Sequence, residues 1–419
     1  MTTAIPFGAM PVGWRMGRIK DLVGGTANGV WGDDPLGDGR DVHCVRAADF
    51  DRESLTVRPE KLPLRRVDPR ALRKHRLSPG DLVWEKSGGG ETQPVGLAVK
   101  FDLAAPAVCS NFCTRVTPSV GTDSRYLGYV FAAAHAAGLN QRSIKQTTGL
   151  QNLDGKAFLA EVWPIPGPAE QRRIADFLDA ETRKIGALVS KKLRLLSLFE
   201  EKINSRILEC IGASRLVGNS DSAIPVLPVR RLLSKLARPA LPASEVITAF
   251  RDGQVTARSK RRADGYTLSS HAEAQGQYVE LGDVVIHGLD GFAGAIGTSE
   301  SAGNCSLVYH VCIPCRGGNA LFLGRMLRVL AVSGYLGLFA TSTRERAVDF
   351  RNWDLFGRIP IPDVPLRWQE EVGEWISSAR PLRVAVERSF ALAEERRRTL
   401  ITAAVTGQID VATAERADA

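Results

Sequence analysis

The sequence contains no long, uninterrupted hydrophobic run. Its most apolar window, residues 321–340, includes two arginines and three glycines, which predicts a helix inside a domain and not a membrane span. The first residues lack the basic start and apolar core of a signal peptide. The seven cysteines are an odd, scattered set, which is typical of reduced thiols. These absences favour a cytoplasmic protein that does not insert into a membrane.

Motifs for catalysis and cofactor binding are absent as well. There is no phosphate-binding Gly-x-x-x-x-Gly-Lys-Ser/Thr loop and no Asn-Pro-Pro-Tyr or Asp-Pro-Pro-Tyr motif for amino methylation. The six histidines form no close pair, which leaves no obvious metal centre. The glycines of Gly291-x-x-Gly294-x-x-Gly297 are wrongly spaced for a dinucleotide loop. We therefore expect no catalytic residues, no metal and no cofactor in this chain.

Two groups of residues resemble parts of reactive sites but have simpler explanations. Cys109-x-x-x-Cys113 and Cys312-x-x-Cys315 have spacings that would suit zinc, yet both lie in apolar, strand-like runs where small buried cysteines are common. Glu200-Glu201-Lys202 contains two carboxylates of the kind found in nucleases. On a charged helix face, a solvated or ion-pairing surface explains these residues better.

A block in the middle of the chain recurs near its end. Pro164-Ile-Pro166 corresponds to Pro360-Ile-Pro362 at an offset of 196 residues, and Gln171 corresponds to Gln369 at an offset of 198. Shorter matches precede the two blocks: Gly80-Asp-Leu-Val83 with Gly282-Asp-Val-Val285, Leu127-Gly128 with Leu323-Gly324, and Asn152-Leu-Asp154 with Asn352-Trp-Asp354. The chain is predicted to run as globule, helix, globule, helix, with an internal repeat.

Each block leads into a long segment whose apolar residues recur at steps of three and four. That spacing predicts one narrow stripe along a helix, and a stripe this narrow needs a partner helix. The predicted packing residues are Ile185, Leu188, Leu195, Phe199 and Ile203 in the first helix and Leu382, Val386, Phe390 and Leu400 in the second. The predicted fold class is α+β, with two similar α/β domains separated by two long antiparallel coiled-coil helices in a pseudo-twofold internal repeat.

A break is predicted near the start of each long helix. Pro381 lies inside the second pattern, where its ring and missing N–H disrupt a helix, and Asp179-Ala-Glu-Thr182 in the first pattern contains good capping residues. The expected short helices are Ala169–Leu178 and Arg367–Ser378. The longer element Thr182–Ile211 would span about 45 Å, which suits two DNA sites about one helical turn, or 34–36 Å, apart.

The composition shifts and the repeat together suggest domain boundaries. The predicted divisions are a first domain at 1–167, a helical region at 168–212, a second domain at 213–365, a helical region at 366–407 and a tail at 408–419, with Cys210–Ser222 as a linker. Strands are expected at Val42–Val45, Asp81–Trp84, Val95–Val99, Val246–Phe250, Val284–Ile286, Ala293–Ile296 and Leu307–Ile313. Helices are expected at Tyr126–Leu139 and from Leu321.

The sequence is well supplied with groups that bind polyanions. The net charge is +9 and the pI is about 9.3, although many soluble proteins are equally basic. A dense basic segment in the second domain supplies Arg251, Arg258, Lys260, Arg261 and Arg262, followed by Tyr266. Such side chains suit phosphate oxygens and base edges. A solvated basic loop remains the alternative explanation.

Two segments of the first domain have a similar character. The glycine-rich stretch from Lys86 to Gln93 would allow its backbone to approach phosphate closely. The stretch 142–148 supplies Arg142, Lys145, Gln146 and Thr147. Either segment is equally compatible with an ordinary hairpin turn.

These motifs resemble the specificity subunit of type I restriction-modification systems. The resemblance rests on the two Pro-x-Pro blocks with their following helices, on the ending Leu400-Ile-Thr-Ala-Ala-Val-Thr-Gly-Gln-Ile-Asp-Val411, and on 250–253, 287–294 and 143–149, which are similar to stretches common in target recognition domains. It covers the whole chain. Trp368, where the first copy has Glu170, and Pro381 depart from the repeat.

The resemblance implies a division of labour. Each target recognition domain would read one half of a bipartite double-stranded DNA target, with the DNA-binding residues named above, and the helices would set the distance between the halves. Two modification subunits, which carry S-adenosylmethionine and methylate adenine, would dock on the helices. Restriction subunits that use ATP and magnesium would join them for cleavage. The alternative is a coiled-coil adaptor that binds proteins without DNA specificity, and the base sequence and spacer length of a target are not predicted.

Overall fold

The computed structural model describes residues 10–89, 93–147, 150–212, 224–261, 276–339 and 349–413. The chain forms two compact units. Unit 1 combines the residues up to Lys191 with those from Arg388 onward, and unit 2 spans Lys192–Glu387. Two long helices, α4 (Pro168–Gly212) and α8 (Leu366–Val405), each contribute one part to unit 1 and the other part to unit 2.

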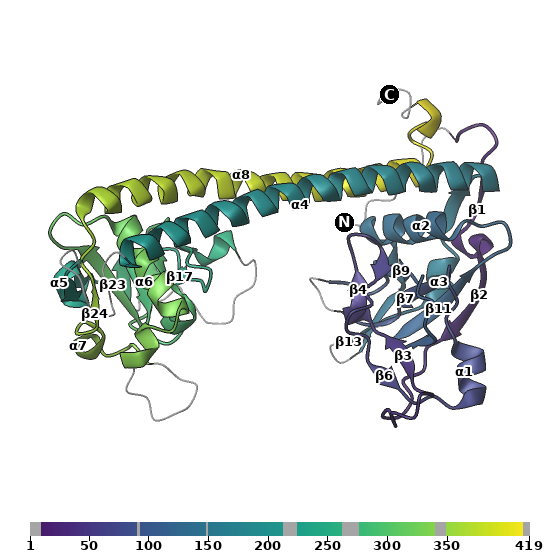
Figure 1. Cartoon of the computed structure of the whole chain (residues 1–419). Helices are drawn as coiled ribbons and strands as arrows, with labels where there is room; N and C mark the ends of the chain where they lie inside the picture. Colours follow the sequence, from purple (N-terminus) through teal and green to yellow (C-terminus); the bar gives the residue numbers. More distant parts are fainter. Residues whose placement is uncertain are drawn as a thin grey trace. The chain divides into compact units, whose positions relative to one another are not determined.

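Unit 1 is an α+β unit with helix α2 packed on a mixed set of short strands (Figure 1). Its strands are β1 (Arg15–Arg18), β2 (Val23–Asn28), β3 (Val42–Val45), β4 (Phe50–Asp51), β5 (Thr56–Val57), β6 (Leu64–Arg65), β7 (Leu82–Glu85), β8 (Ser87–Gly88), β9 (Ala98–Lys100), β10 (Ala107–Cys109), β11 (Cys113–Pro118), β12 (Ile144–Thr147), β13 (Leu150–Leu153) and β14 (Val162–Ile165). Its helices are α1 (Pro69–His75), α2 (Ser124–Ala136) and α3 (Gly155–Leu159), with 3-10 turns η1 (Ile19–Leu22), η2 (Ala47–Asp49) and η3 (Leu139–Ser143). Trp84, Phe131 and Phe158 contact one another in the core through edge-to-face and tilted ring arrangements.

Unit 2 follows the same plan (Figure 1). Its strands are β15 (Val226–Pro228), β16 (Leu233–Leu236), β17 (Ile247–Ala249), β18 (Val255–Ala257), β19 (Gln277–Val279), β20 (Val284–His287), β21 (Ile296–Thr298), β22 (Gly303–Cys305), β23 (Tyr309–Pro314) and β24 (Pro360–Pro362). Its helices are α5 (Val229–Leu232), α6 (Ala320–Val332) and α7 (Trp353–Phe356), with 3-10 turns η4 (Arg258–Lys260), η5 (Gly291–Ala293) and η6 (Leu336–Phe339). Helix α6 buries Phe322, Met326 and Leu327 against the sheet.

Each unit contains its own central antiparallel sheet, and the two sheets use the same strand order. Four strands follow the order β2-β11-β7-β9 in unit 1 and β16-β23-β20-β21 in unit 2. Along the chain, the strands of this sheet are followed in each unit by a helix that packs on the sheet, α2 or α6, and then by a short helix, α3 or α7. The predicted repeat of two similar domains with two long helices is therefore confirmed.

A two-stranded ribbon leads into each long helix. Strand β14 pairs with β1, and β24 pairs with β15, both antiparallel. The sequence match of Asn152-Leu-Asp154 with Asn352-Trp-Asp354 is out of register by two residues in the structure. Asp154 caps α3, whereas Asn352 caps α7. The true equivalents are Asp154 and Asn352, since a helix cap needs a side-chain acceptor at the first turn. Asn152, the residue that the sequence match aligned with Asn352, lies on β13.

The predicted helix breaks are wrong. Both α4 and α8 are single helices, and α8 continues through Pro381. An internal proline costs about 3 kcal/mol, but Arg380 and Arg383 on either side of it bond to residues of unit 2, which holds the helix together. In α4, Asp179 does not cap a helix, because its carboxylate accepts hydrogen bonds from Arg125 and Tyr129 of α2.

The long helices are antiparallel partners in unit 2. Arg206 of α4 bonds to Glu371 of α8, and Glu200 of α4 bonds to Arg383 of α8, so the two helices run in opposite directions. In unit 1 the guanidinium of Arg397 lies 3.4 Å from the position that a Cβ on Gly186 would occupy. The helices of each unit thus pack on each other as well as on the domain.

The predicted packing stripe is only partly buried. Ile185, Ile203 and Val386 are buried, and Phe199, Leu382 and Leu400 are half-buried. The prediction was wrong for Leu188, Leu195 and Phe390, because their side chains are exposed. At 3.6 residues per turn, Leu188 and Leu195 lie about 60° and 80° away from the line through Ile185 and Ile203, and a single partner helix leaves part of the Phe390 ring uncovered.

Several sequence expectations shift at their edges. Cys210 and Ile211, which were predicted to begin a linker, are buried residues of α4, which ends at Gly212, and residues 213–222 of that linker lie outside the described residues. Residues 293–296 are not one strand, because Gly294 adopts a positive φ between η5 and β21. Val95 and Leu97 precede β9, which begins at Ala98. Val411 of the predicted tail packs into the core of unit 1.

The burial of the cysteines agrees with the interpretation that the two paired-cysteine motifs consist of small buried residues. Cys109, Cys113 and Cys312 are fully buried, and burial holds their thiol pKa values well above the ordinary value. Cys315 is half-buried. Within the described ranges, no helix combines the length and the apolar character that crossing a membrane requires.

Candidate nucleic-acid interface

The predicted basic segment of unit 2 is a tight turn followed by a short strand. After β17, the backbone N–H of Phe250 donates to Gln254 and that of Gly253 donates to Phe250, which closes a turn at 250–254. Strand β18 follows, and turn η4 then carries both Arg258 and Lys260. We call residues 250–261 the basic loop. Arg262 and Tyr266, two of the predicted DNA-binding residues, lie outside the described residues.

Acidic neighbours balance part of the charge of the basic loop. Arg251 pairs with Asp290 at 2.9 Å, and Arg261 pairs with Asp252 at 2.8 Å. The guanidinium of Arg261 also lies 4.2 Å from the centre of the Phe250 ring. Lys260 donates to the hydroxyl of Ser301 at 2.9 Å. These partners order the side chains, and Arg251 still exposes 70% of its surface.

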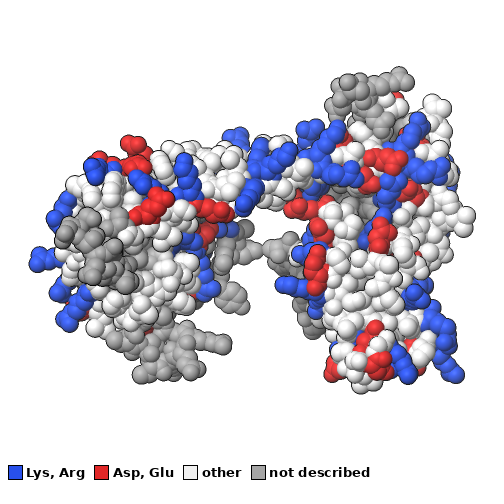
Figure 2. Space-filling model, in the orientation of Figure 1, with Lys and Arg blue, Asp and Glu red and all other residues white. Residues whose placement is uncertain are grey.

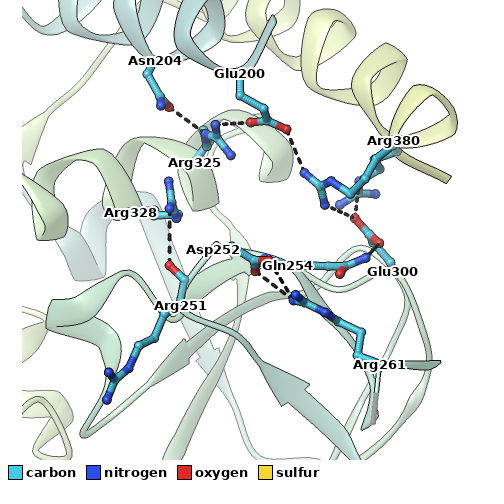
Figure 3. Close-up of polar contacts among 11 residues, drawn as sticks. Glu200, Asn204, Arg251, Asp252, Gln254, Arg261, Glu300, Arg325, Arg328 and Arg380 are labelled. Carbon is cyan, nitrogen blue, oxygen red and sulfur yellow. Dashed lines mark hydrogen bonds and ion pairs between the residues drawn. The ribbon is translucent and has the colours of Figure 1, made fainter. Parts of the chain in front are cut away.

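Glu300 fastens the basic loop to helix α8 (Figure 3). Its carboxylate accepts from Gln254 of the loop at 2.9 Å and from Arg380 of α8 at 3.2 Å. The backbone N–H of Glu300 also donates to Val255, at 2.8 Å. Arg380 also donates to the carbonyl of Thr298. Helix α8 therefore contacts both Thr298 and Glu300, in the segment that lies next to the basic loop.

Glu200 connects the two long helices to α6 within unit 2 (Figure 3). It accepts from Arg383 of α8 at 2.8 Å and from Arg325 of α6, which also donates to Asn204. Burial opposes ionisation of Glu200, but Arg325 and Arg383 hold its pKa below the ordinary value. Glu200 is thus a pairing residue, as the charged helix face indicated. Among the described residues, no cluster of His, Cys, Asp and Glu is arranged to hold a metal ion.

Arg328 lies directly beneath the turn of the basic loop. Its guanidinium donates to the carbonyl of Arg251 at 3.3 Å, while its Nε is buried without a hydrogen bond. Burial lowers the pKa of Arg328. The packing is close: a Cβ on Gly253 would lie 2.4 Å from Arg328, and one on Gly297 would lie 2.0 Å from the Gly253 carbonyl oxygen. The glycines at 291–297 therefore serve packing beside the loop.

In unit 1 the structure brings the two predicted segments together. Strand β8, which holds Ser87, and strand β12, which holds Lys145, both pair with β13 in one three-stranded sheet. The hydroxyl of Ser87 donates to Asn152 at 2.6 Å across this sheet. Nothing in the spacing of the two segments, some 55 residues apart in the sequence, indicated this pairing.

The predicted side chains of unit 1 differ in their partners. Lys145 pairs with Asp154 at 2.9 Å, and Lys86 donates to Asn28 at 3.3 Å. The side chain of Arg142 is exposed on η3 and forms no hydrogen bond or ion pair with the described residues. Gln93 lies against the guanidinium of Arg52. Gln146 and Thr147 lie on β12, and their side chains are outside the described part of the chain.

Basic side chains are distributed over several elements. On the face shown in Figure 2, Lys and Arg follow the exposed side of α4 and are interspersed with Asp and Glu. A single continuous basic surface is not visible on this face. The mixed charge fits the local pairing found in the basic loop.

The sequence did not indicate the residues that anchor the basic loop. Glu300, Arg325, Arg328 and Arg380 stand alone among unrelated neighbours in the sequence, and their partners are up to 125 residues away. The one signal in the sequence was Arg325, an arginine among apolar residues of a predicted helix, which is a pattern that indicates a buried ion pair.

Comparison with solved structures places the fold. A chain described under "Structural basis underlying complex assembly and conformational transition of the type I R-M system" matches over 96% of this chain and 100% of its own length, with 12% identity and a TM-score of 0.62. The HsdS subunit from Thermoanaerobacter tengcongensis (13% identity, TM-score 0.45) covers 96% of this chain and 98% of its own. The type I restriction-modification S subunit from M. genitalium (12%, 0.48) covers 95% and 96%.

Sequence comparison adds no further assignment, because neither a protein-family model nor a curated protein matches the chain. The first of the structural matches spans both units and both long helices of this chain. The chain therefore has the fold of a type I restriction-modification chain, and the resemblance to the specificity subunit that the repeated motifs indicate is confirmed at the level of the fold.

Proposed function

We propose that this chain is the DNA-recognition subunit of a type I restriction-modification complex. The observation that carries the proposal is the duplicated unit, with one central sheet order used twice and each unit joined to the same two long helices. That architecture is shared along the whole chain with a component of such a system. A duplicated reader suits a target in two halves.

The basic loop would meet one half of the target, and the sheet formed by β12, β13 and β8 would meet the other. Arg251, Arg258, Lys260 and Arg261 lie on the basic loop, whose first turn Glu300 and Arg328 hold in place. In unit 1, Lys86, Arg142 and Lys145 lie on or next to one sheet. Ordered cations can position a protein on phosphates, while base edges supply the specificity.

The chemistry would belong to partner subunits. We propose that two modification subunits, which bind S-adenosylmethionine and methylate adenine, dock on the long helices, and that restriction subunits supply ATP- and magnesium-dependent cleavage. Exposed apolar side chains on the helices support a protein contact: Leu188, Phe390 and Leu392 in unit 1, and Leu193, Leu195, Leu198 and Val384 in unit 2. Contiguous exposed apolar patches mark sites of protein interaction.

Charge reversal in the basic loop tests the DNA-binding role. Full-length chain with Arg258→Glu and Arg261→Glu should bind a fluorescent duplex more weakly, and the slope of log affinity against log salt should flatten by about two, because each lost phosphate contact contributes about 0.9. The matched control is Arg230→Glu with Arg231→Glu on α5, which changes the net charge equally at exposed positions. If both double variants bind alike, the basic loop does not contact DNA.

The bipartite target is tested in cells. Methylated adenines in the host genome should fall in one two-part motif when the gene is present and disappear when it is deleted. A genome whose adenine methylation is unchanged by deletion would contradict the proposed function and favour the protein-binding adaptor.

A further inference from the structure

Unit 1 contains an open pocket of about 580 Å³ beside the glycine-rich stretch. Phe50, Arg52, Arg58, Glu85, Gly89 and Gln93 are among the residues that line it. A volume in this range holds a small molecule or a single nucleobase. The pocket lies next to Lys86 and includes Gln93, both of which the sequence predicted to bind DNA.

Glu85 is a buried carboxylate in the wall of this pocket. The residue is only 4% exposed, and its Oε2 is buried without a hydrogen bond. The nearest cation, the guanidinium of Arg52, is 3.7 Å away, which is an ion-pair distance but too long for a hydrogen bond. Burial raises the pKa of Glu85 despite Arg52. Buried carboxylates are normally hydrogen-bonded, so Glu85 lacks a donor that a ligand would supply.

Arg52 is placed to act together with Glu85. Its guanidinium lies against the side-chain amide of Gln93, whose oxygen can accept from Nε at 2.8 Å. The guanidinium of Arg58, by contrast, is used by the backbone carbonyls of Ala48 and Phe50. Asp51 and Glu53 also line the pocket, and its buried acceptor, Glu85, lies next to one oriented donor group, Arg52.

We propose that this pocket binds a single unstacked cytosine of the DNA target, with Glu85 accepting from the exocyclic amine and Arg52 donating to the neighbouring N3 and O2. The inference rests on the proposed function and deepens it by naming a base. Cytosine presents a donor followed by two acceptors along its Watson–Crick edge, which matches a carboxylate beside a forked guanidinium. A base edge inside an intact duplex does not enter a pocket, whereas an extruded base does.

Selection from a randomised duplex library by the full-length chain tests the pocket. The wild type should enrich a target with cytosine at one position, and Glu85→Gln should lower that preference about 10-fold or more, because the new amide opposes an amine with its own donor. Arg52→Met should weaken the preference at the same position. Glu60→Gln, a change at an exposed glutamate of the same unit, should leave the target unchanged. A fluorescent cytosine analogue at that position should brighten on binding as it unstacks.

The possible outcomes separate the pocket from the proposed function. If the wild type enriches a target that Glu85→Gln and Arg52→Met select unchanged, the pocket inference is overturned while the proposed function stands. If the wild type enriches no sequence at all, the proposed function itself fails. If cytidine 5′-monophosphate binds the wild type but not Glu85→Gln, and the selected duplex is the same for both, the pocket takes a free nucleotide and the DNA inference is overturned.

Discussion

The side-chain amide of Gln369 accepts a hydrogen bond from the backbone N–H of Asn319 at 2.9 Å, which ties the first turn of α8 to the cap of α6. Its amide nitrogen donates to the carbonyl of Val364 at 2.7 Å. Gln171 makes the same two bonds in unit 1, to Asp123 and Pro166. The glutamine that both Pro-x-Pro blocks share is thus a buried connector between a domain helix and a long helix.

Replacing Gln369 by alanine should therefore destabilise unit 2. Two hydrogen bonds would be lost and two buried backbone groups left without partners, which costs roughly 2–4 kcal/mol of unfolding free energy. Thermal or denaturant unfolding of the full chain measures the loss. Gln141→Ala, at an exposed position of η3, is the matched control and should change little. Equal stability of the two variants would show that the connector contributes nothing.

Glu200 should make the stability of unit 2 sensitive to acid. Its pKa in the folded chain lies below the ordinary value of 4.5, so its ionised form stabilises the fold above that value. This contribution is lost as the pH falls through the depressed folded pKa. Glu200→Gln should lower the melting temperature near neutral pH and show a smaller difference from the wild type in acid. Glu201→Gln, at an exposed neighbour, should follow the wild type at every pH.

The sequence revealed the elements of the fold that depend on local patterns. Periodic apolar residues and the two Pro-x-Pro blocks predicted both long helices and the repeated domains. Continuity of α8 through Pro381 escaped prediction, because the contacts of Arg380 and Arg383 that hold it come from distant segments. The exposure of Leu195 also escaped it, since a stripe in sequence does not show how wide a surface the partner covers.

The candidate site was predictable in part for the same reason. A run of cations is visible in the sequence, so the basic loop was found, but the pairing of Arg261 with Asp252 and the junction at Glu300 depend on the folded turn. Glu85 ends an apolar strand and resembles the solvated residue that commonly follows one. Its burial follows from the strands around it, which no local pattern encodes.

Close packing at Gly297 should control the position of the basic loop. A Cβ there would lie 2.0 Å from the carbonyl oxygen of Gly253, so the turn of the loop would have to move. Gly297→Ala should cost roughly 1–3 kcal/mol of stability and weaken duplex binding. Gly25→Ala is the matched control, because its added Cβ would meet nothing within 4 Å. A Gly297→Ala variant with wild-type stability and binding would show that the loop tolerates displacement.

Glu85 should have the opposite pH signature to Glu200. Burial raises its folded pKa above the ordinary value, so the folded chain disfavours the ionised carboxylate. The wild type therefore loses stability as the pH rises from the unfolded pKa through the folded one. Glu85→Gln cannot ionise, so it should melt higher than the wild type at neutral pH and approach it in acid. Melting curves from about pH 4 to 8 measure this difference, with Glu60→Gln as the control. A lower melting temperature for Glu85→Gln at neutral pH would mean that Glu85 serves mainly as the ion-pair partner of Arg52, because breaking a buried pair destabilises a protein.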